Sequence, residues 1–224
     1  MRPPDVWEQI AHGWARFARD EDVPYSWNGP AFFELLPPPG RLTVDVGCGE
    51  GRVDRDLTAR GHRVVGIDVS PTLVRLAREA DPAGDYRVGE ASKLPLPDEA
   101  ADLVVAFMSL QDVEDLEGAV AEAARVLEPG GRLCFAILHP ITTAGRLEQD
   151  DEVFAIRGSY LDSFVQGFPM RNELDVPSFH RPIEGYSRAL EAEGFLIEKV
   201  RELSTRRRAP GRIPVFLHVR AVKT

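Results

Sequence analysis

Residues 44–52 read VDVGCGEGR, in which an apolar strand of the buried type runs into a turn with three glycines. Glycine at positions Gly47, Gly49 and Gly51 leaves the backbone bare, so that a ligand can approach it closely. The spacing is G-x-G-x-G, and Arg52 stands where the dinucleotide fingerprint has its third glycine. The turn therefore predicts a ligand-binding loop unlike a dinucleotide site, with a purely structural tight turn as the alternative.

An acidic residue closes the next apolar run. Asp68 follows residues 63–67, about 20 residues after the glycine turn, where a carboxylate can accept hydrogen bonds from both hydroxyls of a ribose. The alternative role for Asp68 is to cap the helix that begins at Pro71, but Ser70 already supplies that cap. Two elements of one nucleoside site thus fall at neighbouring strand ends, which favours ribose binding.

Apolar runs of strand length alternate with helical segments, which is typical of an α/β fold with a parallel sheet. The first runs are continuous rather than alternating, which favours strands buried on both faces. A short turn between the last two runs predicts an antiparallel pair. The expected strands span about 42–46, 63–67, 85–88, 102–107, 132–138, 195–202 and 214–221, and the expected helices span about 6–19, 51–60, 71–80, 115–127 and 182–193.

The chain is expected to form a single domain, because 224 residues suffice for one open α/β core. Residues 1–40 are expected to form an N-terminal helical cap, and residues 41–138 the cofactor-binding core. Residues 139–181 are expected to be a lid or insertion, because periodicity is lost between Leu147 and His180. Residues 182–224 are expected to supply a C-terminal helix and hairpin.

The composition excludes several classes of partner. The chain has 27 Lys and Arg against 36 Asp and Glu, a net charge of −9, which disfavours nucleic acid and anionic membranes. It has neither a run of ~18 apolar residues nor a signal peptide, so a cytoplasmic protein is expected. The expected oligomeric state is a monomer or a homodimer. Cys48 and Cys134 stand in unlike contexts, which predicts neither a disulfide nor a metal site.

Four stretches, in order, resemble the class I S-adenosylmethionine-dependent methyltransferases of the small-molecule kind called methyltransferase type 11. They read VDVGCGEGR, VVGIDVSP, GEASKLPLPDEAADLVVAFMSL and ARVLEPGGRLCFAILHP, and they cover about residues 41–140. The resemblance implies a Rossmann-like, mostly parallel seven-stranded sheet with an antiparallel last strand and helices on both faces. It also implies S-adenosyl-L-methionine as cofactor, S-adenosyl-L-homocysteine as product, and a small organic acceptor methylated at O, N or C.

The same resemblance assigns roles to individual residues. Asp68 is expected to hold the ribose, Glu90 to accept the adenine amino group, and the glycine turn to face the methionine moiety. The family more often has Asp where this chain has Glu90. The full set of expected cofactor-binding residues is Asp45, Gly47, Cys48, Gly49, Gly51, Asp68, Val69, Glu90, Ala91, Phe107 and Met108.

Methyl transfer from a sulfonium requires mainly that an acceptor be positioned and shielded from water. A general base is needed only where the acceptor must lose a proton early. His139 follows the fifth strand, at the sheet edge where ligands bind in open α/β folds, and is the candidate base. Its alternative role is to cap backbone or anchor the lid.

Candidate acceptor contacts come from the segments that flank the core. Tyr25 and Trp27 stand in a polar, proline-containing segment expected to be a loop. Trp7, Trp14 and Phe17 repeat at helical spacing, which favours core packing, with the alternative that Trp14 helps to close an aromatic pocket over the acceptor. An Arg-rich turn around residues 201–212 can steer an anionic substrate, although a solvated hairpin is favoured. The expected substrate-binding residues are Tyr25, Trp27, Gln111, His139 and Tyr160.

Two alternative functions remain open at this stage. A protein that binds S-adenosylmethionine without catalysis would keep the same pocket, because positional catalysis leaves few diagnostic side chains. A nicotinamide-dependent oxidoreductase would share the strand, the glycine turn and the acidic residue, but it would normally have the third spaced glycine.

Overall fold

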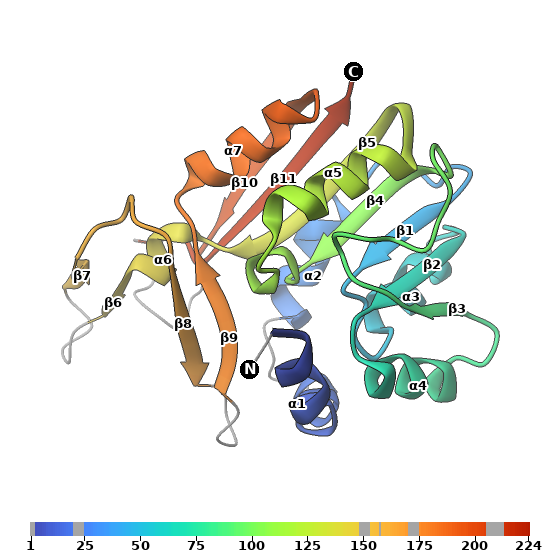
Figure 1. Cartoon of the computed structure of the whole chain (residues 1–224), viewed down its shortest axis with the longest axis horizontal. Coiled ribbons are helices and arrows are strands. Elements are labelled where there is room, and N and C mark those ends of the chain that lie inside the picture. The colour runs from blue at the N-terminus through green and yellow to red at the C-terminus, as the bar shows by residue number, and fades with distance from the viewer. Residues whose placement is uncertain (1–2, 20–24, 148–152, 157, 170–174, 205–212) are drawn as a thin grey trace.

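The computed structural model describes residues 3–19, 25–147, 153–156, 158–169, 175–204 and 213–224. Its main sheet has seven strands in the order β10-β11-β5-β4-β1-β2-β3 (Figure 1). β11 runs antiparallel to both of its neighbours, and the remaining pairs are parallel, which confirms the predicted α/β fold. The strands are β1 Thr43–Val46, β2 Val64–Asp68, β3 Asp85–Val88, β4 Ala101–Phe107, β5 Leu127–Leu138, β10 Phe195–Leu203 and β11 Phe216–Lys223.

Helices cover both faces of this sheet. In Figure 1, α5 and α7 lie on the near face and α2 lies behind the strands. Leu103 and Val105 of β4 pack with the α2 and α3 side, whereas Val104 and Ala106 pack with the α5 and α7 side, as the period of two in a strand requires. The helices are α1 Pro3–Ala18, α2 Tyr25–Phe33, α3 Arg52–Ala59, α4 Pro71–Ala80, η1 Leu110–Asp112, α5 Leu116–Val126, α6 Pro140–Ala144 and α7 Ile183–Ala192.

Two sequence-based expectations were wrong. The segment that holds Tyr25 and Trp27 is helix α2, although Pro30 lies inside it. Burial of Phe32, which is 0% exposed, against Phe107 of β4 overrides the weak local helix propensity. The segment from Leu147 to His180, expected to be irregular, contains β7 Phe154–Ile156, which pairs with β6 Gly145–Leu147, and the antiparallel ribbon of β8 Phe164–Pro169 and β9 Asp175–His180; α6 precedes it.

Some expectations fall outside the described residues. Of the Arg-rich turn, residues 205–212 are not described, and Arg201 is exposed on β10.

In the described part of the chain, no helix has both the length and the apolar character needed to cross a bilayer. Cys48 and Cys134 are buried free thiols.

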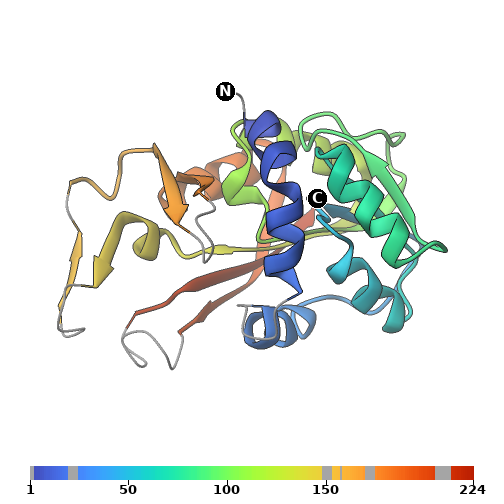
Figure 2. The ribbon, with the colours of Figure 1, turned by 90° about the horizontal axis from the view of Figure 1, so that it is seen from below.

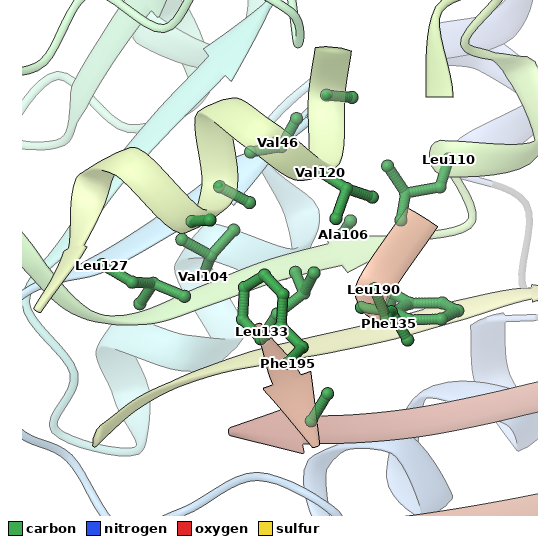
Figure 3. Packing of buried hydrophobic residues seen from close by; sticks show 14 of the residues in the cluster. Val46, Val104, Ala106, Leu110, Val120, Leu127, Leu133, Phe135, Leu190 and Phe195 are labelled. Atoms are coloured by element: carbon green, nitrogen blue, oxygen red, sulfur yellow. The ribbon is translucent and has the colours of Figure 1, made fainter. Parts of the chain in front are cut away.

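The larger core cluster lies between the sheet and the helices α5 and α7 (Figure 3). Phe135 of β5 is 1% exposed and stacks on Tyr186 of α7 with ring centroids 6.0 Å apart. Removing such a ring leaves a cavity that the surrounding strands cannot fill. This layer therefore holds the sheet in place, and the site lies at the carboxyl ends of its strands.

Phe135→Ala should lower the free energy of unfolding by about 3–5 kcal/mol in urea denaturation. Val165→Ala, at a side chain 62% exposed on β8, is the control and should change it by less than about 0.5 kcal/mol. Equal effects from the two substitutions would contradict the assignment of Phe135 to the core.

Two carboxyl groups are buried together beneath the glycine turn. Asp45 of β1 and Asp54 of α3 are 1% and 2% exposed; their carboxyl groups are within hydrogen-bonding reach of each other, and neither is bonded to any other described side chain. Burial and the neighbouring Asp54 raise the pKa of Asp45 well above its usual range, and burial raises the pKa of Asp54 to about 7. A proton shared by the pair gives each group a partner and avoids two adjacent buried charges.

The pair predicts a specific pH dependence of stability. The unfolded chain releases this proton near pH 4 and the folded chain holds it to about pH 7, so the free energy of unfolding should fall as pH rises between these values. In Asp54→Asn the fall should be shallower when unfolding is measured from about pH 4.5 to 7.5. Asp162→Asn, at an exposed position, is the control. Parallel curves for wild type and Asp54→Asn would contradict the raised pKa of Asp54.

Candidate functional site

A cavity of about 290 Å³ lies at the carboxyl ends of β1, β2, β3 and β4. In an open α/β sheet this edge, where the strand order reverses between β1 and β4, is the usual place for a ligand. Its volume is at the lower end of the roughly 300–1,000 Å³ of small-molecule pockets. The lining residues are Trp7, Trp14, Val46, Gly47, Gly49, Ile67, Asp68, Val69, Leu73, Gly89, Glu90, Ala91, Ser92, Phe107, Met108, Ser109, Asp112, Val113, Glu114 and Asp115.

The glycine turn after β1 forms the floor of the cavity. Gly47 has a φ of 79°, and a Cβ at this position would lie 2.4 Å from Cβ of Ser109. Gly51 also has a φ of 79°, and its Cβ would lie 2.9 Å from the Tyr86 ring. A side chain at either position would need both a disfavoured backbone conformation and a shift of its neighbour. The conformation of the turn therefore requires glycine at these positions, and the absence of side chains leaves its backbone accessible to a ligand in the cavity.

Asp68 ends β2 and is fixed by two backbone amides. Its Oδ2 accepts from the N–H of Gly49 at 2.9 Å, and its Oδ1 accepts from the N–H of Ser70 at 2.9 Å. Burial raises the pKa of Asp68, and these two N–H groups oppose the shift. A carboxylate has about four lone-pair sites, so each oxygen can accept a further hydrogen bond from a ligand. Ser70 caps α4 through Leu73, as the sequence predicted.

Met108 forms the wall next to β4 in a strained conformation. Its φ of 58° is uncommon for a residue with a side chain, and such strain persists only where neighbours enforce it. The N–H of Met108 donates to the carbonyl of Ala136 at 2.8 Å, and Nε2 of Gln111 donates to the Met108 carbonyl at 2.6 Å. Gln111, expected to contact substrate, therefore lies behind the lining and supports it.

Helix α1 forms one wall of the cavity. Figure 2 places α1 across the sheet edge between α4 and the β8–β9 ribbon, and it contacts both. Trp7 and Trp14 line the cavity, and Trp14 also packs against the buried cluster of Ala11, Ala15 and Leu73, so the stripe combines the expected core packing with a cavity wall. The positions of the two tryptophans, seven residues apart, put them on one face of the helix, which was visible in the sequence, but spacing alone does not distinguish a core from a cavity.

The cavity has an acidic lining. Asp68, Glu90, Asp112, Glu114 and Asp115 line it, and none of the described lining residues is Lys, Arg or His. Burial raises the pKa of Asp112 well above its usual range, so this residue contributes less negative charge than an exposed aspartate would, and the acidic character rests mainly on the other four residues. Such a surface attracts a ligand with positive charge and repels a pyrophosphate. A ligand with a ribose, a flat apolar base and a cationic group fits these walls.

Eight of the expected cofactor residues line the cavity, and three do not. Asp45 and Cys48 are buried behind the glycine turn, where burial raises the pKa of the Cys48 thiol, and Gly51 packs on Tyr86. The eight that line it are Gly47, Gly49, Asp68, Val69, Glu90, Ala91, Phe107 and Met108.

Of the expected substrate-binding residues, Tyr25 and Tyr160 lie outside the described cavity lining, and the side chain of Trp27 is not described by the structure. Tyr25 donates its hydroxyl to Asp56 and contacts the ring of Phe107 with centroids 5.5 Å apart, so it supports the wall from outside the described lining. Tyr160 contacts His180, away from the cavity lining.

His139 has a structural environment. It is the N-cap of α6, and its Nδ1 accepts from the N–H of Ile141 at 3.1 Å. Its Nε2 lies 2.9 Å from Oε1 of Glu202 on β10. Burial lowers the pKa of His139, against the effect of Glu202, so the ring is neutral at pH 7. His139 is outside the described lining, which favours the capping role over the catalytic one.

Comparison with known proteins agrees with this geometry. Residues 44–135 match the family model described as methyltransferase domain. The chain is 37% identical over 111 residues to a malonyl-[acyl-carrier protein] O-methyltransferase from Serratia marcescens, which covers 50% of this chain and 42% of the relative. It is 30% identical over 130 residues to the ubiquinone/menaquinone biosynthesis C-methyltransferase UbiE from Caulobacter vibrioides, covering 52% of each. The chain thus spans about half the length of these curated relatives.

The likeness extends further among solved structures. An S-adenosylmethionine-dependent methyltransferase from Mesorhizobium loti is 28% identical, has a TM-score of 0.76, and covers 91% of this chain and 100% of its own. The glycine turn and Asp68 lie within the family match, whereas α1 precedes it. Residues 44–135 of this chain are thus similar to a methyltransferase domain, and the fold is similar to that of the S-adenosylmethionine-dependent methyltransferase from Mesorhizobium loti.

Proposed function

We propose that this protein transfers the methyl group of S-adenosylmethionine to a small organic acceptor. The observation that carries the proposal is the cavity at the ends of β1 and β2, where Asp68 is held by the Gly49 amide and keeps lone pairs for a ribose. The acidic lining supports a cationic cofactor over an anionic one. The net charge of −9 supports a partner other than nucleic acid, and we expect a cytoplasmic monomer or homodimer.

The cofactor supplies a methyl group on a positively charged sulfur, which is electrophilic without acid catalysis. The residues of the chain then have three tasks: Asp68 orients the sugar, the glycine turn admits the amino-acid end, and the apolar walls hold the base. Val69, Leu73 and Ile67 supply apolar surface beside the expected adenine position. Trp7 and Trp14 shield the wall of the cavity that α1 forms from water. Positioning of this kind lowers the activation free energy of the transfer by up to ~7–11 kcal/mol.

The atom that receives the methyl group is a separate question. The relatives include an O-methyltransferase and a C-methyltransferase, so the family match is compatible with either outcome. Asp112, the last residue of η1, is an acidic residue of the cavity lining, and it is better placed than His139 to contact an acceptor. The proposal therefore includes a small acceptor at the ends of β4 and η1, with O, N or C as the methylated atom.

Asp68→Ala should weaken binding of S-adenosylhomocysteine by about 1–3 kcal/mol, roughly 5- to 150-fold in Kd, because the ribose loses its acceptor. Isothermal titration calorimetry measures this directly. Asp85→Ala, at the exposed start of β3 and outside the described lining, is the control and should bind as wild type does. An unchanged affinity in Asp68→Ala would remove Asp68 from the site.

Catalysis is distinguished from binding alone by transfer of label. Incubation with methyl-labelled S-adenosylmethionine and a panel of hydroxyl, amine and activated-carbon acceptors should yield a labelled small molecule. Release of S-adenosylhomocysteine should rise in step with it. Tight cofactor binding with no labelled product from any class would favour the binding-protein alternative. A rise in NADH fluorescence on mixing would instead favour the oxidoreductase.

A further inference from the structure

Helix α1 lies outside the family-matched residues 44–135, yet it supplies one wall of the cavity. Trp7 and Trp14 pack edge to face, with ring centroids 5.4 Å apart and an interplanar angle of 84°. Both line the cavity. One wall of the cavity thus comes from an element that is separate from the sheet, so the position of this wall depends on how α1 is attached.

Glu8, between the two tryptophans in sequence, attaches α1 to the first turn of α4. Its Oε2 accepts from Oγ of Ser70 at 2.5 Å and from the N–H of Thr72 at 3.1 Å. Its Oε1 accepts from Oγ1 of Thr72 at 2.6 Å. The Thr72 amide is one of the four N–H groups that a helix leaves without an internal partner, and the negative charge also complements the helix dipole. Glu8 therefore caps α4 from a different helix.

The residue that Glu8 contacts also holds the predicted ribose ligand. Ser70 donates its N–H to Oδ1 of Asp68 at 2.9 Å and its hydroxyl to Glu8. Ser70 is 0% exposed, so its two donors have fixed partners. A displacement of Glu8 is thus transmitted through one residue to the Asp68 carboxylate.

The same helix places a donor over the glycine turn. Nε1 of Trp14 lies 3.5 Å from the position that a Cβ on Gly49 would take. Gly49 in turn donates its N–H to Oδ2 of Asp68, at the other end of the carboxylate from Ser70. Both oxygens of Asp68 are therefore linked to residues that α1 contacts or faces.

We propose that Glu8 is a positioning residue of the cofactor site, which holds α1 closed over the cavity and fixes Asp68 through Ser70. This inference rests on the proposed function, because it takes the nucleoside to lie on Asp68. The Glu8 contacts hold Trp7 and Trp14 against the cavity, so their loss should ease release of the nucleoside past α1. Loss of Glu8 should therefore increase the dissociation rate of the nucleoside and have a smaller effect on the thermal unfolding of the protein.

The test compares Glu8→Ala, Glu8→Gln and the control Gln9→Ala, at the neighbouring exposed position of α1, which makes none of the contacts to Ser70 or Thr72. We expect Glu8→Ala to weaken S-adenosylhomocysteine binding roughly 3- to 30-fold, mostly through faster dissociation in stopped-flow tryptophan fluorescence. Glu8→Gln keeps one acceptor oxygen and should recover part of the loss. Gln9→Ala should bind and release the ligand as wild type does. Thermal unfolding of each variant checks that the fold is intact.

Hydrogen exchange of the ligand-free protein supplies an independent measurement. Amides of the first turn of α4 should exchange faster in Glu8→Ala than in wild type and Gln9→Ala. Equal affinities and equal dissociation rates in Glu8→Ala and wild type would overturn the proposal. Failure of the proposed function itself would appear differently, as absence of binding in the wild type.

Discussion

The site depends on one link between two strands, the hydrogen bond from the Gly49 amide to the Asp68 carboxylate. It joins the turn after β1 to the end of β2 at the edge where ligands bind in this kind of sheet. The link requires glycine in the turn, a buried carboxylate on the next strand, and a sheet rigid enough to hold them 2.9 Å apart. The two helical layers supply that rigidity through the packing of β4 and β5.

Several elements with no direct role in chemistry serve this geometry. Gln111 holds the strained Met108, Tyr25 supports Phe107 from behind, and Ser70 joins Asp68 to the N-terminal helix. The carboxyl pair of Asp45 and Asp54 lies directly beneath the glycine turn, where a shared proton avoids a buried double charge. The site is thus a backbone cradle with an acidic lining, built for positioning rather than for nucleophilic attack.

The features predicted from sequence are those with local physical causes. Continuous apolar runs must be buried on both faces, so the parallel strands were predictable, and the glycine turn and Asp68 follow from backbone chemistry. Helix α2 was missed because Asn28, Gly29 and Pro30 all disfavour a helix, and tertiary contacts stabilise it, among them the packing of Phe32 against Phe107 and the hydrogen bond between Asn28 and His218.

Other features of the site have no local signature. For Trp14, core packing was favoured over a place in the pocket, because an apolar stripe has the same spacing whether it faces a core or a cavity. His139 stood at the correct sheet edge, but its partners on α6 and β10 could be identified only from the fold. The most direct measurement of the central claim is a crystal structure with S-adenosylhomocysteine. The account predicts both ribose hydroxyls within about 2.6–3.2 Å of the Asp68 carboxylate. A nucleoside bound elsewhere, with Asp68 contacting only Gly49 and Ser70, would contradict it.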